Sequence, residues 1–437
     1  MINKNNITDV SLSYMCSNCG ACSAICPTNA ITFNFTNIGR YPAVIDEKKC
    51  ISCKLCRKVC PSLDEQKIIE KFNNPFIGDI KKVLVGRCNN DNLFLNAQSG
   101  GACSATISYL FSTNKIDAAI VCEMKIGNPP KIVATIITEV QEVKNSQKSC
   151  YTPVSLLSIL PEIKKFKSVA IVGLPCHIEG IESLQRLSKF SNIKYRLGLV
   201  CDRTLCNYSM EFFGKLANFS TEFKIIWKYK LLNFKNKIYN YKEAPLTLIN
   251  RNGFIKVFPN TYRFLIKDIF TPPRCWVCYD KINNFADIVF GDPWRMSNID
   301  EINGSSLMIV RTEIGSQLIE DLKQAKIILM SERPIEELIK GQLINERKKQ
   351  VSRFSKALQV LPHKINSYLY TQALDINNSK EEIQKSRQIL HNFTILELKS
   401  KSYIFKKVKK HLFFHYYIKK YITSNIRSKI KILLNIK

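Results

Sequence analysis

Eight of the 17 cysteines in this chain lie within its first 65 residues, in two copies of one pattern. Each copy reads C-x2-C-x2-C-x3-C-P, in which three closely spaced thiolates can hold one cubane cluster while the fourth reaches elsewhere. In two-cluster ferredoxins, that fourth cysteine binds the other cluster. We therefore expect two [4Fe-4S] clusters. Their predicted ligands are Cys16, Cys19, Cys22 and Cys60 for one cluster, and Cys50, Cys53, Cys56 and Cys26 for the other.

Structural zinc is the alternative for these cysteines, because zinc sites also use C-x2-C pairs. A zinc site needs four ligands in two pairs, however, and has no use for a third cysteine and a Cys-Pro in each copy. The doubled pattern therefore favours clusters that transfer electrons, although it names no substrate. Residues 30–46, between the two copies, predict a β-hairpin that covers the clusters.

Two glycine corners follow in the rest of the chain. Ser99, Gly100 and Gly101 precede a helix predicted over residues 102–112, and free backbone N–H groups at such a start suit a pyrophosphate. A plain helix cap with a tight turn explains the same residues. The second corner begins at Gly173, directly after a predicted strand, where open α/β sheets bind ligands.

Four more thiols could meet near the second corner. Cys176 lies within it, Cys201 ends the next predicted strand, and Cys275 and Cys278 form a close pair downstream. Four thiols are enough for a third cluster. A redox disulfide or half of a zinc site is the alternative for the close pair. The other five cysteines are expected to be small core side chains: Cys88, Cys103, Cys122, Cys150 and Cys206.

The order of these motifs resembles the β-subunit family of coenzyme F420 hydrogenases and dehydrogenases, which is also similar to 7-hydroxymethyl chlorophyll reductase. The resemblance covers about residues 10 to 330, through QSGG, VGLPCH, GLVC, CWVC, ADIVFGDPW and SLMIVRTEIG. It implies FAD in an α/β body with a [4Fe-4S] cluster nearby. The implied flavin residues are Ser99, Gly100, Gly101 and Gly173, and the implied body-cluster ligands are Cys176, Cys201, Cys275 and Cys278.

The chain departs from the usual family pattern at two places. His177 stands where the family usually has Gln, and Asp202-Arg203 stand where it has His-Gly. His177 could act catalytically by giving a proton or a hydrogen bond at the flavin edge, because its ordinary pKa lies near neutrality. A merely structural hydrogen bond is the alternative for His177, and Asp202 could simply pair with Arg203.

These residues together predict an oxidoreductase. We expect electrons to pass between the [4Fe-4S] clusters and FAD, and on to a small molecule that accepts or donates hydride, either coenzyme F420 or another reducible compound. The alternative is a non-catalytic electron-relay subunit of a larger redox complex. The expected protein partner is a ferredoxin or another redox protein.

The elements that must position these groups divide the chain into four parts. Residues 1–65 predict an α+β ferredoxin-like dicluster domain, and a polar linker spans about 64–82. Residues 80–155 and 156–335 predict the two parts of an α/β flavin-binding body, because β-rich runs alternate with helical ones as in a parallel sheet. An antiparallel insertion is expected over 223–258, and residues 336–437 predict a helical, basic extension.

Composition adds a charge imbalance. The 437 residues carry 65 Lys+Arg against 36 Asp+Glu, and the 45% apolar share excludes a disordered chain. In residues 398–437 there are 12 Lys or Arg and no acid, with apolar residues at helical spacing from Phe405 to Ile430. Such a helix predicts contact with a membrane surface or a partner, or docking on the protein's own body. No nucleic-acid-binding motif accompanies this charge.

The expected location is the cytoplasm. The first ten residues lack the apolar core of a signal peptide, and no apolar run reaches about 18 residues. Many cysteines in a cytoplasmic chain more often mean metal binding or catalysis than disulfides. If the basic extension binds lipid, the protein would be peripheral at the membrane surface.

Overall fold

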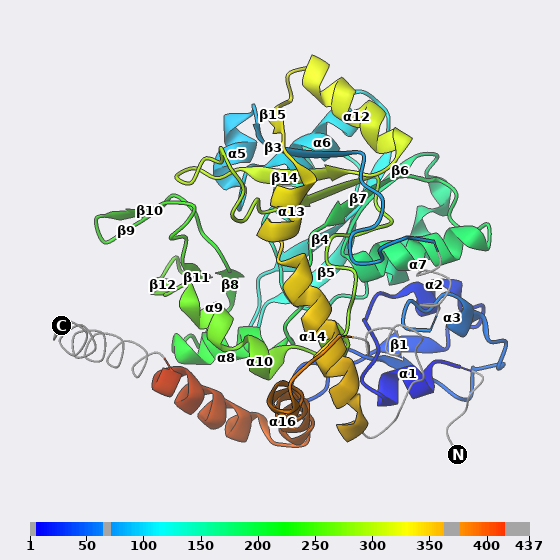
Figure 1. The fold of residues 1–437 in the computed structure, drawn as a ribbon, viewed down its shortest axis with the longest axis vertical. Coiled ribbons are helices and arrows are strands. Elements are labelled where there is room, and N and C mark those ends of the chain that lie inside the picture. Colours follow the sequence, from blue (N-terminus) through cyan, green and yellow to red (C-terminus); the bar gives the residue numbers. More distant parts are fainter. Residues whose placement is uncertain (1–5, 64–70, 362–375, 416–437) are drawn as a thin grey trace.

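The computed structural model describes residues 6–63, 71–361 and 376–415. The first of these ranges is a small α+β unit, coloured dark blue in Figure 1. Its elements are α1 (Thr8–Leu12), α2 (Ala21–Ile25), β1 (Ile31–Phe33), β2 (Ala43–Ile45) and α3 (Leu55–Lys58). β1 and β2 pair antiparallel, with Ile31 opposite Ile45, so the predicted hairpin is confirmed.

An eight-stranded sheet forms the centre of the body (Figure 1). In spatial order its strands are β15 (Ile328–Glu332), β3 (Lys82–Cys88), β14 (Ser306–Val310), β13 (Ile288–Gly291), β7 (Ile193–Leu199), β6 (Val169–Gly173), β4 (Ala118–Lys125) and β5 (Lys131–Ile137).

The sheet is mixed, whereas the sequence predicted a parallel one. Strands β13, β7, β6 and β4 run parallel, but β5, β14 and β15 each run antiparallel to their neighbours. Only residues 126–130 join β4 to β5, which is too short for the crossover that a parallel pair requires. The parallel prediction was therefore correct for the centre of the sheet and wrong at its edges.

Both faces of the sheet are buried. In β3, Val83 and Val85 belong to the same apolar core as α7 (Pro175–Arg186) and the N-terminal unit, whereas Leu84 belongs to the core that contains α6 (Ala102–Ser112) and α12 (Glu313–Gln324). Successive side chains point to opposite faces of a strand, so a strand covered on both sides reads as a continuous apolar run. This explains why VLV, IDAAIVC and SVAIVG could be recognised as strands.

The predicted antiparallel insertion is present. It contains β8 (Phe223–Ile226), β9 (Leu232–Phe234), β10 (Lys237–Tyr239), β11 (Leu246–Asn250) and β12 (Ile255–Phe258). Strands β12, β11 and β8 form one antiparallel sheet, and β9 and β10 form a separate hairpin. The helices α8 (Tyr208–Leu216), α9 (Thr261–Leu265) and α10 (Lys267–Phe270) lie beside it, where they share a third apolar core.

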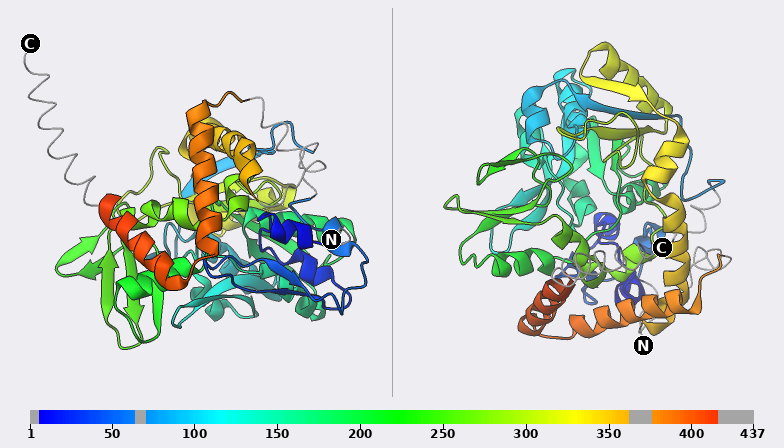
Figure 2. Two further views of the ribbon diagram at one scale, coloured as in Figure 1. Left: turned by 90° about the horizontal axis from the view of Figure 1, so that it is seen from below. Right: turned by 60° about the vertical axis from the view of Figure 1, so that its left-hand side comes forward.

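The described parts of the C-terminal extension, up to residue 361 and over 376–415, are mainly helical, as predicted. It contains α13 (Ile335–Gly341), α14 (Ile344–Ala357), α16 (Lys380–Glu397) and a helical stretch over 401–415. Figure 2 shows α14, α16 and residues 401–415 crossing one side of the molecule, from the sheet to the insertion. Within 6–63, 71–361 and 376–415, no helix is long and apolar enough to cross a membrane.

Candidate functional site

Four of the N-terminal cysteines line one pocket, which is partly open to solvent. They are Cys26 from the first copy of the motif and Cys50, Cys53 and Cys56 from the second. The backbone N–H of Ala30 donates to Cys26 Sγ at 3.3 Å, and Asn6 Nδ2 donates to Cys50 Sγ at 3.7 Å. Hydrogen bonds to sulfur are one means by which proteins tune iron-sulfur clusters, so this donor set fits a cluster.

The other four N-terminal cysteines form a second, deeper set. Burial raises the pKa of Cys22 well above its usual value, and the neighbouring Cys19, Cys16 and Cys60 raise it further. Cys19 and Cys22 are buried, whereas Cys53 of the first set is exposed. The structure therefore brings Cys60 into the group of the first motif and Cys26 into that of the second, with one group at the surface and one inside.

A third set lies at the carboxyl edge of the parallel strands. Cys176 lies in the first turn of α7, Cys201 follows β7, and Cys275 lies in α11 (Pro273–Trp276) just before Cys278. Burial raises the pKa of Cys176 well above its usual value, and its neighbours Cys19, Cys201, Cys278 and Cys275 add to this effect. These four thiols are therefore close to one another, although they come from three separate segments.

The third set adjoins the deeper N-terminal set. Cys176 Sγ lies 4.0 Å from the carbonyl oxygen of Ser17, and a Cβ on Gly180 would lie 3.7 Å from Cys19 Sγ. Helix α7 therefore packs directly on the N-terminal unit through a glycine. The three cysteine sets form a series from the surface to the edge of the sheet.

None of these sets is shaped for a single ion. In the described ranges, no three His, Cys, Asp or Glu side chains are arranged to hold one metal ion. A four-iron cubane is larger than one ion, so its ligand sulfurs stand further apart.

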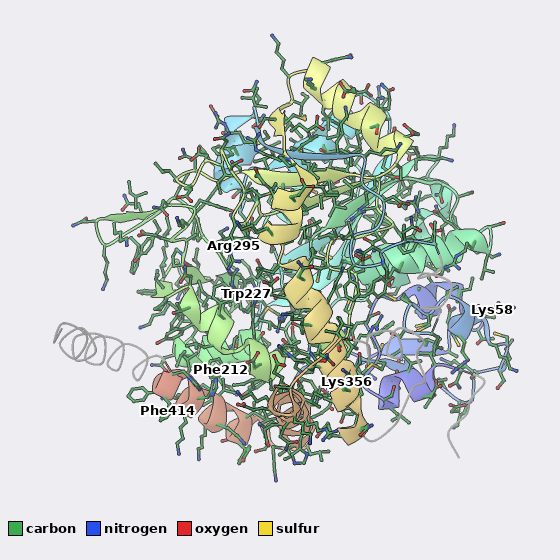
Figure 3. All side chains as sticks on the ribbon, viewed as in Figure 1. Lys58, Phe212, Trp227, Arg295, Lys356 and Phe414 are labelled. Carbon is green, nitrogen blue, oxygen red and sulfur yellow. The ribbon has the colours of Figure 1, made fainter. Side chains whose placement is uncertain are left out.

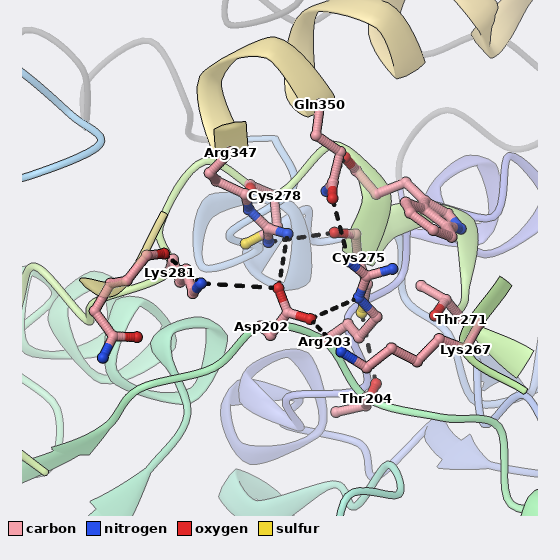
Figure 4. Close-up of polar contacts among 12 residues, drawn as sticks. Asp202, Arg203, Thr204, Lys267, Thr271, Cys275, Cys278, Lys281, Arg347 and Gln350 are labelled. Carbon is pink, nitrogen blue, oxygen red and sulfur yellow. Dashed lines mark hydrogen bonds and ion pairs between the residues drawn. The ribbon is translucent and has the colours of Figure 1, made fainter. Parts of the chain in front are cut away.

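The loop with Cys275 and Cys278 is held by helix α14 (Figure 4). Arg347 Nε donates to the carbonyl of Cys278 at 2.8 Å, and its Nη2 lies 3.4 Å from the carbonyl of Cys275. Gln350 Nε2 donates to the carbonyl of Trp276, whose ring stacks on Phe354 at 4.3 Å between centroids. The four-residue loop thus has its backbone fixed from outside.

Asp202 lies at the centre of a partly buried charge cluster beside this loop (Figure 4). Its carboxylate accepts hydrogen bonds from Arg203 at 2.9 Å and Lys267 at 3.0 Å, and Lys281 and Arg347 lie 4.0 and 3.9 Å away. Burial would raise the pKa of Asp202, but these cations together hold it well below its usual range. Asp202 does pair with Arg203, and it also organises three further cations around the third cysteine set.

The glycine corner is fixed by close packing. Gly101 has a φ of +76° and caps α6, a conformation that favours glycine. A Cβ on Gly100 would lie only 2.4 Å from the backbone nitrogen of Ser306 in β14. Lys230 Nζ donates to the carbonyl of Ser99 at 2.6 Å. The corner therefore meets both the sheet and a buried cation from the insertion.

Buried cations and aromatic rings gather near this corner. The side chains of this group are Lys228, Lys230, Arg263, Tyr151, Trp227, Tyr241, Asp292 and Trp294. Lys228 Nζ lies 3.1 Å from Asp292 and 3.4 Å from the ring centroid of Tyr241. Burial lowers the pKa of Lys230 to about 8. Among the described residues, the buried Trp227 Nε1 has no hydrogen-bond partner.

This group could hold a flavin. The cations suit its phosphates, and the unpaired indole N–H suits an acceptor on the ligand. Asp292 follows β13 and Ser306 begins β14, so the group lies at the same sheet edge as the third cysteine set. Ligands of open α/β sheets bind at that edge.

His177 lies within α7 and is buried. Its Nδ1 accepts a hydrogen bond from the backbone N–H of Leu174 at 3.2 Å, and burial lowers its pKa to about 4. At the start of this turn, the carbonyl oxygen of Gly173 accepts a hydrogen bond from Asn283 Nδ2 at 2.9 Å. Both residues shape the turn that presents Cys176, and the ring is neutral at pH 7.

The remaining predictions concern single cysteines and the basic extension. Cys88 and Cys206 are fully buried, and Cys103 and Cys122 are partly buried against the apolar cores. Cys150 is partly buried but belongs to none of these cores. In the helical stretch 401–415, Ile404, Val408 and Leu412 pack on the core of α8 and the insertion. The apolar face of residues 401–415 is therefore docked on the protein's own body. Residues 416–437 of the predicted basic helix lie outside the described residues.

Comparison with known proteins identifies the family. The family model for the N-terminal part of the coenzyme F420 hydrogenase/dehydrogenase beta subunit matches residues 83–161, and that for its C terminus matches 166–335. A 4Fe-4S dicluster domain model matches residues 15–63. The chain belongs to this beta-subunit family. It is therefore an iron-sulfur oxidoreductase of the hydrogenase/dehydrogenase beta-subunit type.

Relatives extend over most of the chain. It is 25% identical to a subunit of the F420H2 dehydrogenase of Methanosarcina mazei, over 78% of this chain and 92% of that protein. It is also 25% identical to a coenzyme F420-dependent sulfite reductase of Methanocaldococcus jannaschii, over 72% of this chain but only 46% of that protein. A chain of the F420-reducing [NiFe] hydrogenase complex of Methanosarcina barkeri shares the fold, with a TM-score of 0.50 and 19% identity, over 66% of this chain and 93% of that one.

Sequence reasoning missed several residues of the site. Lys228 and Lys230 stand two apart in a strand-like apolar run, so their shared face was a signal that could have been used. Arg347 and Gln350 carried no signal, because they meet a loop that lies 69 to 74 residues earlier in the chain.

Proposed function

We propose that this protein is an iron-sulfur flavoprotein that passes electrons between three [4Fe-4S] centres and FAD, and on to a substrate that accepts or donates hydride. The observation that carries the proposal is the series of three neighbouring cysteine sets, which ends at the sheet edge where buried cations gather. A hydride carries two electrons and a cluster carries one. FAD supplies the exchange between them, because it is stable with zero, one or two added electrons.

The order of the cysteine sets defines the proposed path. Cys53 is exposed, Cys19 and Cys22 of the second set are buried, and Cys176 adjoins that second set. A protein partner such as a ferredoxin would meet the surface set, and electrons would pass inward through the second set to the third. Cys16, Cys19, Cys22 and Cys60 would hold the middle centre, and Cys176, Cys201, Cys275 and Cys278 the innermost one.

FAD would lie against the glycine corner and the buried cations. Ser99, Gly100 and Gly101 offer backbone that can approach a phosphate closely, and Gly173 shapes the turn next to the third set. The ammonium of Lys230, which donates to the carbonyl of Ser99, would also bind a phosphate of FAD. His177 would act by holding this turn, because its ring lies buried with Nδ1 bonded to Leu174.

The substrate proposed is coenzyme F420 or a compound of similar reactivity. The support comes from relatives, four of which carry this coenzyme in their names. Because relatives also include subunits of larger assemblies, the second candidate is an electron relay whose substrate site lies on a partner. We place the protein in the cytoplasm, where free cysteines and clusters persist in reduced surroundings.

Anaerobic purification with measurement of iron, sulfide and flavin tests the proposal. About twelve irons and one FAD are expected from three four-iron centres. Cys275→Ser should remove about four irons and leave the two N-terminal clusters, whereas Cys103→Ser, on α6, should remove none. Mixing with reduced coenzyme F420 should then bleach the flavin absorbance, and adding oxidised coenzyme F420 to the reduced protein should restore it.

Each failed measurement has its own meaning. Absent flavin would refute the flavoprotein. Unchanged iron in Cys275→Ser would refute the third centre. Flavin that responds to a ferredoxin but to no small-molecule hydride carrier would favour the relay.

A further inference from the structure

Arg347 is the one charged side chain that joins the C-terminal extension to the third cysteine set among the described residues. It lies in α14, beyond residue 335, where the match to the family ends. Its side chain is only 3% exposed. A buried guanidinium must be compensated by hydrogen bonds and opposite charge, so its position calls for an explanation.

Two of its nitrogen atoms are used on the loop backbone. Nε donates to the carbonyl of Cys278 at 2.8 Å, and Nη2 reaches the carbonyl of Cys275 at 3.4 Å. The planar fork of a guanidinium holds two acceptors in a fixed geometry, which a lysine cannot do. Arg347 therefore fixes the distance between the two cysteines of the CWVC pair.

The third nitrogen is unsatisfied. Among the described residues, the buried Nη1 of Arg347 makes no hydrogen bond, and its nearest acid is Asp202 at 3.9 Å. Asp202 already binds Arg203 and Lys267 closely. A buried donor without a partner is rare in proteins and points to a group that the chain itself does not supply.

The cations around the third set outnumber the acids. Arg274 and Arg347 lie near its thiols, and Arg203, Lys267 and Lys281 surround Asp202 beside it. The acids are Asp202, Glu179 and Asp280. A four-iron cluster with four thiolates carries negative charge in both redox states and gains one more on reduction. A net positive surround favours the reduced form.

We propose that Arg347 is a positioning residue that holds the Cys275–Cys278 loop and compensates the charge of the third iron-sulfur centre, which raises the reduction potential of that centre. The inference rests on the proposed third centre. The inference adds that the C-terminal extension helps to set the reduction potential of this centre.

Redox titration of the full-length protein, followed by electron paramagnetic resonance, tests this proposal. In Arg347→Met the equilibrium constant for reducing the third centre should fall about tenfold, which is about 59 mV for a one-electron couple. Arg347→Lys keeps the charge, so its potential should stay near that of the wild type while its signal broadens as the loop loosens. Asp202→Asn removes a negative charge and should shift the potential in the opposite direction.

Lys349→Met is the matched control, because it removes an exposed charge from the same helix. It should leave the potential and the iron content unchanged. Equal potentials in Arg347→Met, Asp202→Asn and the wild type, with a full complement of iron, would overturn the proposal. If Arg347→Met loses the third centre altogether, the shift in Asp202→Asn decides the charge effect. If Cys275→Ser leaves the iron content unchanged, the proposal of a third centre is refuted, rather than the role of Arg347 alone.

Discussion

The N-terminal unit and the body assemble cysteine sets in different ways. In the N-terminal unit all eight cysteines lie between residues 16 and 60, and short helices such as α2 and α3 present them directly. In the body, four cysteines from three segments between residues 176 and 278 meet only after the sheet has formed. The first kind of site is local in sequence, whereas the second depends on tertiary structure.

The difference also extends to what supports each set. The loop of the body set is held by α14 and by the stack of Trp276 on Phe354. The N-terminal unit meets α16 at one buried ion pair, between Arg40 and Glu397 at 2.9 Å. At its other edge it carries Lys58, well away from the extension (Figure 3). Changes in the extension should therefore affect the body set more than the N-terminal sets.

The largest expected effect is at Phe354. Phe354→Ala should lower the free energy of unfolding of the body by roughly 3–5 kcal/mol, because it removes a fully buried ring and leaves Trp276 without its stacking partner. Urea unfolding followed by tryptophan fluorescence measures this. Phe414→Ala, which truncates an exposed ring (Figure 3), should stay within about 0.5 kcal/mol of the wild type. If Phe354→Ala loses the N-terminal clusters as readily as the proposed third one, the two regions are not independent.

Glu397→Ala should cause the next largest loss of unfolding free energy. It leaves Arg40 buried without its carboxylate, which costs roughly 3 kcal/mol or more for a buried pair. The loss should appear in urea unfolding followed by cluster absorbance in the visible range, because Arg40 belongs to the N-terminal unit. Glu381→Ala removes an exposed partner on the same helix and should change nothing measurable. Equal effects of the two variants would show that the α16 contact does not stabilise the N-terminal unit.

A smaller effect is expected at the start of α16. The Ser379 hydroxyl accepts a hydrogen bond from the Glu382 backbone, and the Glu382 carboxylate accepts one from the Ser379 backbone. Ser379→Ala should cost about 1 kcal/mol of unfolding free energy by removing this cap. Circular dichroism during thermal unfolding measures it, with exposed Ser402→Ala as the control. A loss as large as that of Glu397→Ala would mean that the whole helix depends on its cap.

The smallest effect concerns pH. Burial would raise the pKa of Glu182, but Lys71 and Arg196 outweigh it and lower that pKa below its usual value. The carboxylate therefore stabilises the fold above about pH 4.3, and this contribution is lost as pH falls through the lower folded pKa. Because Glu182 is partly exposed, the gain over Glu182→Gln should be only a few tenths of a kcal/mol at about pH 6. It should vanish toward about pH 3; a constant difference would exclude this ion pair as its source.

The N-terminal sets could be predicted from sequence because cysteine spacing alone specifies them. The hairpin over 30–46 and helix α6 at residues 102–112 could be predicted for a similar reason, since each is set by local pattern. The edge strands were assigned the wrong direction, because alternating strands and helices do not record that five residues join β4 to β5. Direction depends on connection length as well as on element type.

The body site was only partly predictable. Its cysteines were found through motif order, but the side chains that support them were not. Lys228 and Lys230 come from the insertion, and Arg347 comes from the extension. Long-range contacts of this kind leave no periodic pattern in a single sequence. The extension was correctly predicted as amphipathic, yet only its packing revealed that Val408 and Leu412 face the protein itself.

β3 is synthesised long before the two strands that pair with it. β3 ends at Cys88, but its two neighbours are β14 and β15, which leave the ribosome more than 200 residues later. Pairings so distant in sequence form slowly, and until then both edges of β3 are open to other chains. The cysteines of the N-terminal unit are all translated before β3 begins. A nascent chain could therefore receive the two clusters of its N-terminal unit while the body is still unfinished and most prone to aggregate.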